Sequence, residues 1–505
     1  MSLNTAQDAT DMTTETARHI STEKSIEISV VEDAEKAEQT KAKDITIVAM
    51  RNFYIIASAY LLFTLTDSAL RMVVLLELYQ RHYNALQISI MFMLYEFLGV
   101  VTNLVAGIIG ARLGLRFCLV TGLIFQLIGI GVLIGLQEDW SRTWVIIYIA
   151  LAQGFSGVAK DMVKLGGKSV TKLVTHEDGQ HQSKLFKLVA WLTGAKNSIK
   201  GAGFFLGALL LNIVSYRVSL SVLLGMIAII LPPSMLWLDS QLAVSKRKEA
   251  LTLRQIFDKG RDVNILSLAR MFLFGSRDLW FEVPLPLFLR GPFGWSFIAT
   301  GALLAGWVIF YGAVQSSTPQ LILRPLGIYP IEKATYLVPS TLVLLIVTIA
   351  VAIVLTVIKE INTTLLALLL VGLFAFAFVF AINSSIHSFL ILSYCHRDKV
   401  AMNVGFYYMA NAMGRLVGLI LGGVLFYYVG LYACLWTSAG ALLICMIVSA
   451  FLGPLCGADL SPPDLSPPDL SPPDLSPPDL SPPDLSPPDL SPPSIPSSDH
   501  TSINH

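Results

Sequence analysis

Two lysines lie four residues apart within a long apolar stretch, Leu185–Ile213. On a helix, Lys196 and Lys200 would share one face, where their like charges repel each other. An ammonium group at membrane depth is costly, so it normally faces a wet cavity or a partner of opposite charge. An anion lying between the two lysines would offset both costs. The pair therefore predicts a binding site for a negatively charged solute within a membrane.

Four more cationic side chains interrupt apolar stretches of the chain. The arginines among them suit planar or tetrahedral oxyanions, because a guanidinium group donates two parallel hydrogen bonds. Lys160 starts a ladder of lysines, spaced by four residues as far as Lys172, that would draw anions towards the inner mouth of the site. For the later lysines of the ladder, the alternative is a role in membrane topology. We predict that the solute binds to Arg71, Lys160, Lys196, Lys200, Arg270 and Arg277.

Acidic side chains accompany these cations. Asp67 lies one helical turn from Arg71, and Glu96 lies in the next apolar stretch. A carboxylate in an apolar setting can exchange a proton near neutral pH, so Asp67 and Glu96 are our candidate residues for proton coupling. The alternative is structural. In that case Asp67 pairs with Arg71, Glu96 neutralises Arg71 or the lysine pair, and Asp278 and Glu282 neutralise the arginines near them.

The composition shows which elements must position these charges. Of the 505 residues, 54% are hydrophobic and 14% are charged, whereas soluble domains carry about 25% charged residues. A membrane-spanning helix needs roughly 20 mostly apolar residues. We predict an all-α membrane protein with twelve transmembrane helices in two six-helix halves. The expected helices are Asn52–Leu78, Ile88–Ala111, Leu115–Leu136, Trp144–Val163, Leu185–Ile213, Ser219–Leu238, Ile265–Leu289, Phe297–Leu321, Ala334–Ile358, Thr364–Leu392, Val400–Tyr428 and Leu431–Leu452.

The apolar stretches divide the chain into five parts. Most Lys and Arg residues of the loops fall on the side of the amino terminus, so both termini and the central loop should be cytoplasmic. We expect a monomer in the plasma membrane. The parts are an acidic, disordered tail (1–48), a first half (49–238), a central loop (239–263), a second half (264–453) and a disordered tail (454–505).

The carboxyl-terminal tail repeats the unit Ser-Pro-Pro-Asp-Leu six times, from Ser461 to Leu490. Two prolines in every five residues exclude regular helix and sheet and favour an extended, polyproline-like chain. One interpretation is a docking site for a proline-reading domain. The other is an expanded repeat without a selected role.

Other classes of site are missing from the sequence. The five cysteines are scattered, without the spacing of a metal site or a disulfide framework. No nucleotide-binding loop and no arrangement typical of a catalytic site occurs. We therefore expect neither an enzyme nor a cofactor, a metal or a nucleic-acid partner. In the later spans, Arg415 is expected to bind substrate or to cap a neighbouring helix, and His387 to be a satisfied packing residue.

The short loop after the second predicted span carries a recognisable pattern. Gly107, Arg112, Gly114 and Arg116 match the loop motif Gly-x-x-x-Asp-Arg-x-Gly-Arg/Lys-Arg/Lys of the major facilitator superfamily, which the chain resembles here. Ala111 stands where that motif has its acid. In the superfamily this loop latches the two halves on the cytoplasmic side. The resemblance therefore implies a gating loop that lacks the contribution of the acid.

Longer blocks resemble the ArsJ-type organoarsenical efflux permeases of that superfamily, with Ser68 in place of the glycine expected there. The resemblance implies export of 1-arseno-3-phosphoglycerate, which glyceraldehyde-3-phosphate dehydrogenase makes when arsenate replaces phosphate. The product falls apart outside, so that arsenate is expelled. The likeness covers most of residues 50–450 and leaves both tails without a counterpart. The blocks are Phe63–Met72, Leu94–Leu104, Ser156–Asp161, Leu192–Phe205 and Ala269–Phe281.

These observations favour a secondary transporter that exports a small organic anion by alternating access, with proton antiport as a candidate driving force. Two alternatives stay open at this point. One is an exchanger of sugar phosphates or phosphoglycerate that uses the same cationic site. The other is a solute sensor or scaffold that no longer transports and binds partners through its repeat tail.

Overall fold

The structure of the protein is a computed structural model that describes five segments of the chain. Both predicted tails and most of the predicted central loop lie outside the described residues. All regular structure within the five segments is helical, as the apolar stretches predict. The described residues are 50–174, 182–238, 260–327, 334–394 and 400–453.

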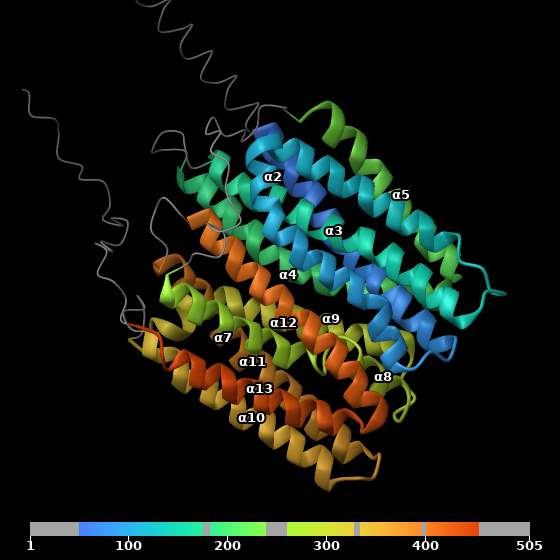
Figure 1. Cartoon of the computed structure of the whole chain (residues 1–505), viewed down its shortest axis with the longest axis vertical. Helices are drawn as coiled ribbons and strands as arrows, with labels where there is room; N and C mark the ends of the chain where they lie inside the picture. The colour runs from blue at the N-terminus through green and yellow to red at the C-terminus, as the bar shows by residue number, and fades with distance from the viewer. Residues whose placement is uncertain (1–49, 175–181, 239–259, 328–333, 395–399, 454–505) are drawn as a thin grey trace, which may run out of the picture. The chain divides into compact units, whose positions relative to one another are not determined.

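The first half places six predicted spans in five helices of the described part (Figure 1). One of them, α2, is a run of 50 residues that contains two predicted spans, because Gly114 breaks its helical backbone with φ 81° and ψ 172°. Glycine adopts this positive φ without the steric cost that a β-carbon brings. The helices are Met50–Gln80, α2 (Ala85–Ile134), α3 (Arg142–Val174), α4 (Gln182–Ile213) and α5 (Tyr216–Leu236).

The second half begins with a broken helix. α7 ends at Asp278, a turn follows over residues 279–283, and Pro284 opens the short helix α8. Proline suits the first turn of a helix, because the N–H group that it lacks has no helical partner there. The elements are α7 (Arg261–Asp278), α8 (Pro284–Arg290), α9 (Phe297–Ser317), a π-helical turn (Thr318–Leu323), a 3-10 turn (Ala334–Tyr336), α10 (Leu337–Val357), α11 (Thr363–Ser393), α12 (Val400–Tyr428) and α13 (Leu431–Ser449).

Ten helices of the described part are long and apolar enough to cross a membrane. They coincide with ten of the twelve predicted spans. The other two predicted spans, Leu185–Ile213 and Ile265–Leu289, are helical as α4 and as α7 with α8. The all-helical membrane fold is therefore confirmed. The two helical positions outside the ten carry the lysine pair and two of the three arginines of the predicted site, Arg270 and Arg277.

Among the labelled helices, two pairs join the halves: α2 packs along α12, and α4 packs along α9 (Figure 1). Small residues allow the close approach. A β-carbon on Gly423 would lie 2.2 Å from Ser89 Oγ, and one on Gly201 would lie 2.7 Å from a backbone oxygen of α9. Across the second pair, Asn197 donates a hydrogen bond of 3.2 Å to Gln315. Charged side chains of α2 and α12 therefore come within reach of one another.

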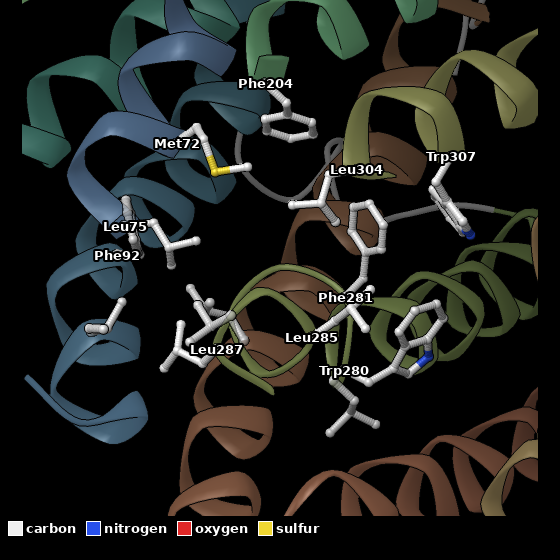
Figure 2. Packing of buried hydrophobic residues seen from close by; sticks show 14 of the residues in the cluster. Met72, Leu75, Phe92, Phe204, Trp280, Phe281, Leu285, Leu287, Leu304 and Trp307 are labelled. Carbon is white, nitrogen blue, oxygen red and sulfur yellow. The ribbon is translucent and has the colours of Figure 1, made fainter. Parts of the chain in front are cut away.

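Large apolar side chains surround the turn between α7 and α8 (Figure 2). Trp280 and Phe281 of the turn pack against Trp307 of α9, with ring centres 6.1 and 4.3 Å apart. Phe204 of α4 and Leu75 of the first helix belong to the same buried cluster. The turn is thus held by elements of both halves.

Candidate functional site

Four charged side chains form a closed ring where the two halves meet. Arg71 lies 2.9 Å from Glu96 and 2.5 Å from Glu282. Arg415 lies 2.8 Å from Glu96 and 2.9 Å from Glu282. Each acid thus bridges two guanidinium groups. The most exposed of the four side chains is Arg415, at 15%, so solvent screens these interactions little.

The two halves of the protein each supply one arginine and one acid to the ring. The first half supplies Arg71 and Glu96, and the second half supplies Arg415 and Glu282. When the halves separate, the two cross-half bonds break, but Arg71 keeps Glu96 and Arg415 keeps Glu282. An uncompensated buried charge would cost several kcal/mol. The ring can therefore open without leaving any of its charges unpaired.

Lys160 extends the ring within the first half. Its Nζ atom lies 3.6 Å from Glu96 Oε2 and 4.0 Å from the centre of the Tyr95 ring, where a cation–π contact adds to the ion pair. Glu96 therefore faces three cations and is 1% exposed. Glu96 thus neutralises Arg71, as in the alternative that we set against proton coupling. Its other two cationic partners are Lys160 and Arg415, not Lys196 and Lys200.

Arg277 extends the ring within the second half. Asp278 lies 2.5 Å from Arg277 and 2.9 Å from Arg415. The Arg277 guanidinium also lies over the rings of Phe274 and Phe380, 5.0 and 5.6 Å from their centres. Arg277 is thus neutralised by the adjacent acid in this conformation, which matches the structural alternative for this helix.

Asp67 does not pair with Arg71, although the helical spacing would allow it. Arg71 reaches across to Glu96 and Glu282, because there it meets two carboxylates instead of one. Asp67 Oδ2 accepts a hydrogen bond of 2.8 Å from the Tyr95 hydroxyl. Its Oδ1 atom is buried and has no hydrogen-bond partner in the described segments. Asp67 is therefore an acid without an ion pair to any described residue.

The predicted lysine pair differs from the other cations. Neither Lys196 nor Lys200 forms an ion pair within the described part of the chain. Lys200 Nζ lies 5.5 Å from the centre of the Phe204 ring. Both lysines are half-buried on α4, so their charges depend on groups other than the described acids.

Arg270 lies in a cradle of neutral groups. Its guanidinium donates to Asn411 Oδ1 at 3.3 Å and to the carbonyl and hydroxyl oxygens of Ser384 at 3.3 and 3.2 Å. It stacks 3.9 Å from the centre of the Phe274 ring and is 5% exposed, with no ion pair to a described acid.

His387 lies one turn from Ser384 and is fully buried. Neither ring nitrogen of His387 has a hydrogen-bond partner among the described residues, so it is not the satisfied packing residue that we expected.

A narrow pocket lies beside the ring. Arg71 and Glu282 form its polar wall, and the rest is apolar. It offers about 20 Å³ to the centre of a water molecule, which is room for about one water. The halves must therefore move apart before an organic solute can enter here. The apolar lining residues are Met72, Leu75, Phe92, Phe204, Phe281 and Leu304, all labelled in Figure 2.

This helical arrangement around central charges can be compared with known proteins. The family model of the Major Facilitator Superfamily matches residues 56–391. The chain belongs to this superfamily. It is a multi-pass membrane protein and a transporter of the general major facilitator kind.

Solved structures of other transporters share the fold. A bacterial homologue of the iron transporter ferroportin in its inward-facing state is 15% identical, with a TM-score of 0.60 over 79% of this chain and 98% of that one. A mutant of the nucleoside transporter NupG is 13% identical, with a TM-score of 0.58 over 80% of this chain and 99% of that one. The human organic anion transporter MFSD10 (TETRAN) is 15% identical, with a TM-score of 0.56 over 79% of this chain and 99% of that one. At these identities the likeness concerns the fold alone. No curated protein sequence matches the chain.

The loop that resembles the major facilitator motif lies at the break in α2. Gly114 provides the positive φ of the break, and Arg116 donates a hydrogen bond to the backbone oxygen of Met235 at the end of α5. This contact stays within the first half. Gly107 and Arg112 lie on α2, in a stretch whose side chains are outside the described part.

Arg415 makes ion pairs in this major facilitator site that sequence reasoning missed. It contacts three acids, whereas we expected it to bind substrate or to cap a helix. A signal was present in the spacing: Lys200 and Arg415 each precede two glycines, by three and by seven residues. Because the two halves of such transporters are structural repeats, equal spacing marks equivalent positions. The glycines are Gly203 and Gly207 in α4 and Gly418 and Gly422 in α12.

Proposed function

We propose that this protein is a secondary transporter of a small organic anion. The observation that carries the proposal is an excess of positive charge in the core. The ring, the predicted site and the residues paired with them, together with the pair Asp161–Lys164 beside Lys160, hold eight cationic and five acidic side chains, an excess of three positive charges. The cations are Arg71, Lys160, Lys164, Lys196, Lys200, Arg270, Arg277 and Arg415, and the acids are Asp67, Glu96, Asp161, Asp278 and Glu282.

The ion pairs show which cations of this set have no acid partner; among the five acids, Asp67 has no ion pair to a described residue either. Lys196, Lys200 and Arg270 form no ion pair with a described acid, whereas the other five cations do. A cation at membrane depth without a partner is expensive. A solute with at least two negative charges would compensate these side chains, and this supports an anionic substrate over a neutral or cationic one.

Within this class we propose 1-arseno-3-phosphoglycerate as the exported solute. It carries a tetrahedral oxyanion group at each end, which suits guanidinium and ammonium donors. The blocks that resemble ArsJ-type permeases contain all six predicted substrate-binding cations: Arg71, Lys160, Lys196, Lys200, Arg270 and Arg277. One transporter that shares the fold, MFSD10, is an organic anion transporter, but at 15% identity this likeness does not select a substrate class.

Transport would proceed by opening and closing of the two halves, with the ring of ion pairs broken and re-formed in each cycle. For the coupling proton we propose Asp67, because it has a single hydrogen bond and no described ion pair, whereas three cations hold Glu96. We further propose that the protein works as a monomer in the plasma membrane, with both termini on the cytoplasmic side.

The test is arsenic efflux from liposomes that contain the purified protein. The liposomes enclose radiolabelled arsenate, glyceraldehyde 3-phosphate, NAD⁺ and the dehydrogenase, and arsenic release is followed with and without a pH gradient. We expect faster release than from liposomes that lack either the dehydrogenase or the transporter. A release that does not depend on the dehydrogenase would contradict the proposed solute.

A parallel assay addresses the exchanger. Liposomes loaded with labelled 3-phosphoglycerate are diluted into buffer with or without external 3-phosphoglycerate. If this phosphoester is exchanged without arsenic and no arsenic efflux is seen, the protein is a phosphoglycerate exchanger and not the proposed exporter. Absence of any anion flux in both assays would reject the proposed function.

A further inference from the structure

The carboxylate of Glu282 lies between two arginines of opposite halves. One oxygen is 2.5 Å from Arg71 Nη2, and the other is 2.9 Å from Arg415 Nη2. This is how two guanidinium groups clamp an oxyanion. We propose that the anionic group of the substrate takes this place, and that Glu282 is an internal substitute that occupies the clamp in the empty transporter. The inference rests on the proposed function and adds Arg415 to the substrate-binding residues.

Glu282 is more easily displaced than the other acid of the ring. Glu96 lies within the helical stretch of α2 before its break and has Lys160 as a third partner. Glu282 lies in the turn 279–283, has only the two arginines as ion-pair partners in the described segments, and lines the pocket. A turn can shift its side chain without breaking helical hydrogen bonds. Glu282 is therefore the acid that can leave while Glu96 stays.

The pocket indicates what accompanies the anionic group. Next to the clamp, the wall consists of aliphatic and aromatic side chains, including Leu75, Phe204 and Phe281 (Figure 2). An inorganic anion would leave this wall without a partner. The ligand class is therefore an organic oxyanion, with its carboxylate, phosphate or arsenate group between Arg71 and Arg415 and its carbon skeleton against the apolar wall.

Competition between Glu282 and the substrate has two consequences. Without the Glu282 charge, an external anion meets less competition and binds more tightly. Without that charge, however, the empty transporter has no Glu282 carboxylate to bridge Arg71 and Arg415 while it changes conformation. Net transport, which needs that empty step, should slow, whereas exchange, in which the site is always loaded, should continue.

Binding is measured with the purified full-length protein and 3-phosphoglycerate as the probe, by isothermal titration calorimetry. We expect the dissociation constant of Glu282→Gln to be about tenfold lower than that of the wild type. Glu282→Asp keeps the charge but shortens its reach to both arginines, so it should give a smaller gain. The matched control is Glu77→Gln, whose acid pairs with Arg81 at 2.7 Å, away from the ring, and it should bind like the wild type.

Equal or weaker binding by folded, monodisperse Glu282→Gln would overturn the inference, since an acid with a purely structural role gives that result. The second readout is the ratio of exchange to net efflux of 3-phosphoglycerate in liposomes. We expect this ratio to rise about tenfold in Glu282→Gln. If both the ratio and the binding stay unchanged while the protein still transports the probe, Glu282 is not an internal substitute, and the proposed function is unaffected. If neither protein binds or moves the probe, the proposed function fails, and the inference fails with it.

Discussion

Lys200 and Arg415 occupy equivalent positions in the two halves of the protein. Each precedes two glycines at the same spacing, and these glycines press α4 onto the first helix and α12 onto α7. A β-carbon on Gly207 would lie 2.3 Å from the backbone oxygen of Ala69 in the first helix, and one on Gly422 would lie 2.2 Å from that of Leu279, directly after α7. Arg415 nevertheless meets three acids, whereas Lys200 meets none in the described segments. The halves are alike in packing and unlike in charge, and this difference leaves Lys200 available to a solute.

Replacement of Lys200 with glutamine should lower anion transport at least about tenfold, the effect of losing roughly 1.4 kcal/mol of binding. Because no described acid depends on Lys200, the amount of protein in the membrane should stay normal. Lys196→Gln should behave in the same way. The liposome efflux assay, with protein quantified by immunoblot, checks this. Lys359→Gln, which removes an exposed loop lysine, is the control, and wild-type flux in both α4 variants would mean that these lysines do not bind substrate.

Arg415→Gln should destabilise the protein by about 3–5 kcal/mol, because it deprives three buried acids of a partner. The melting temperature in detergent should fall accordingly. The double variant Arg415→Gln with Glu282→Gln should regain part of the loss, since it removes one of the uncompensated acids. As a control, Arg81→Gln breaks a more exposed pair at a helix end and should cost less than about 1 kcal/mol. An unchanged melting temperature of Arg415→Gln would show that the ring does not hold the halves together.

Gly422→Ala should destabilise the protein by about 1–3 kcal/mol, because the new methyl group would overlap the backbone of Leu279 at the end of α7. Gly440 in α13 provides the matched control, since a β-carbon added there would meet no neighbouring atom of the described part within 4 Å. Gly440→Ala should be neutral or stabilising by about 0.5–1 kcal/mol, as expected for alanine in a helix interior. Thermal unfolding measures both, and equal melting temperatures would contradict the close packing of α12 on α7.

Deletion of residues 457–505, which contain the Ser-Pro-Pro-Asp-Leu repeat, should leave anion flux within about twofold of the full chain, because every residue of the proposed site lies before it. A scaffold or sensor that works through this tail would lose its effect. Flux in liposomes and arsenate resistance of cells that express the two forms distinguish these outcomes. Loss of resistance together with retained flux in liposomes would assign the tail a cellular partner.

The sequence alone determined the helical membrane fold and the cations of the core. Both are properties of short windows: about 20 apolar residues suffice to cross a bilayer, and a charge inside such a window stands out wherever it occurs. The lysine pair and Arg270 could therefore be singled out before their surroundings were known. The shared spacing of Gly203 and Gly207 after Lys200 and of Gly418 and Gly422 after Arg415 is likewise visible in the sequence.

The partners of those charges were decided only by the tertiary structure. Arg71 had an acid one turn away in Asp67, yet it pairs with Glu96 and with Glu282 of the other half. Arg415 bonds to Glu96 across 319 positions of sequence. Coulomb attraction depends on distance in space and on burial, and neither follows from spacing along the chain once helices of different halves come into contact.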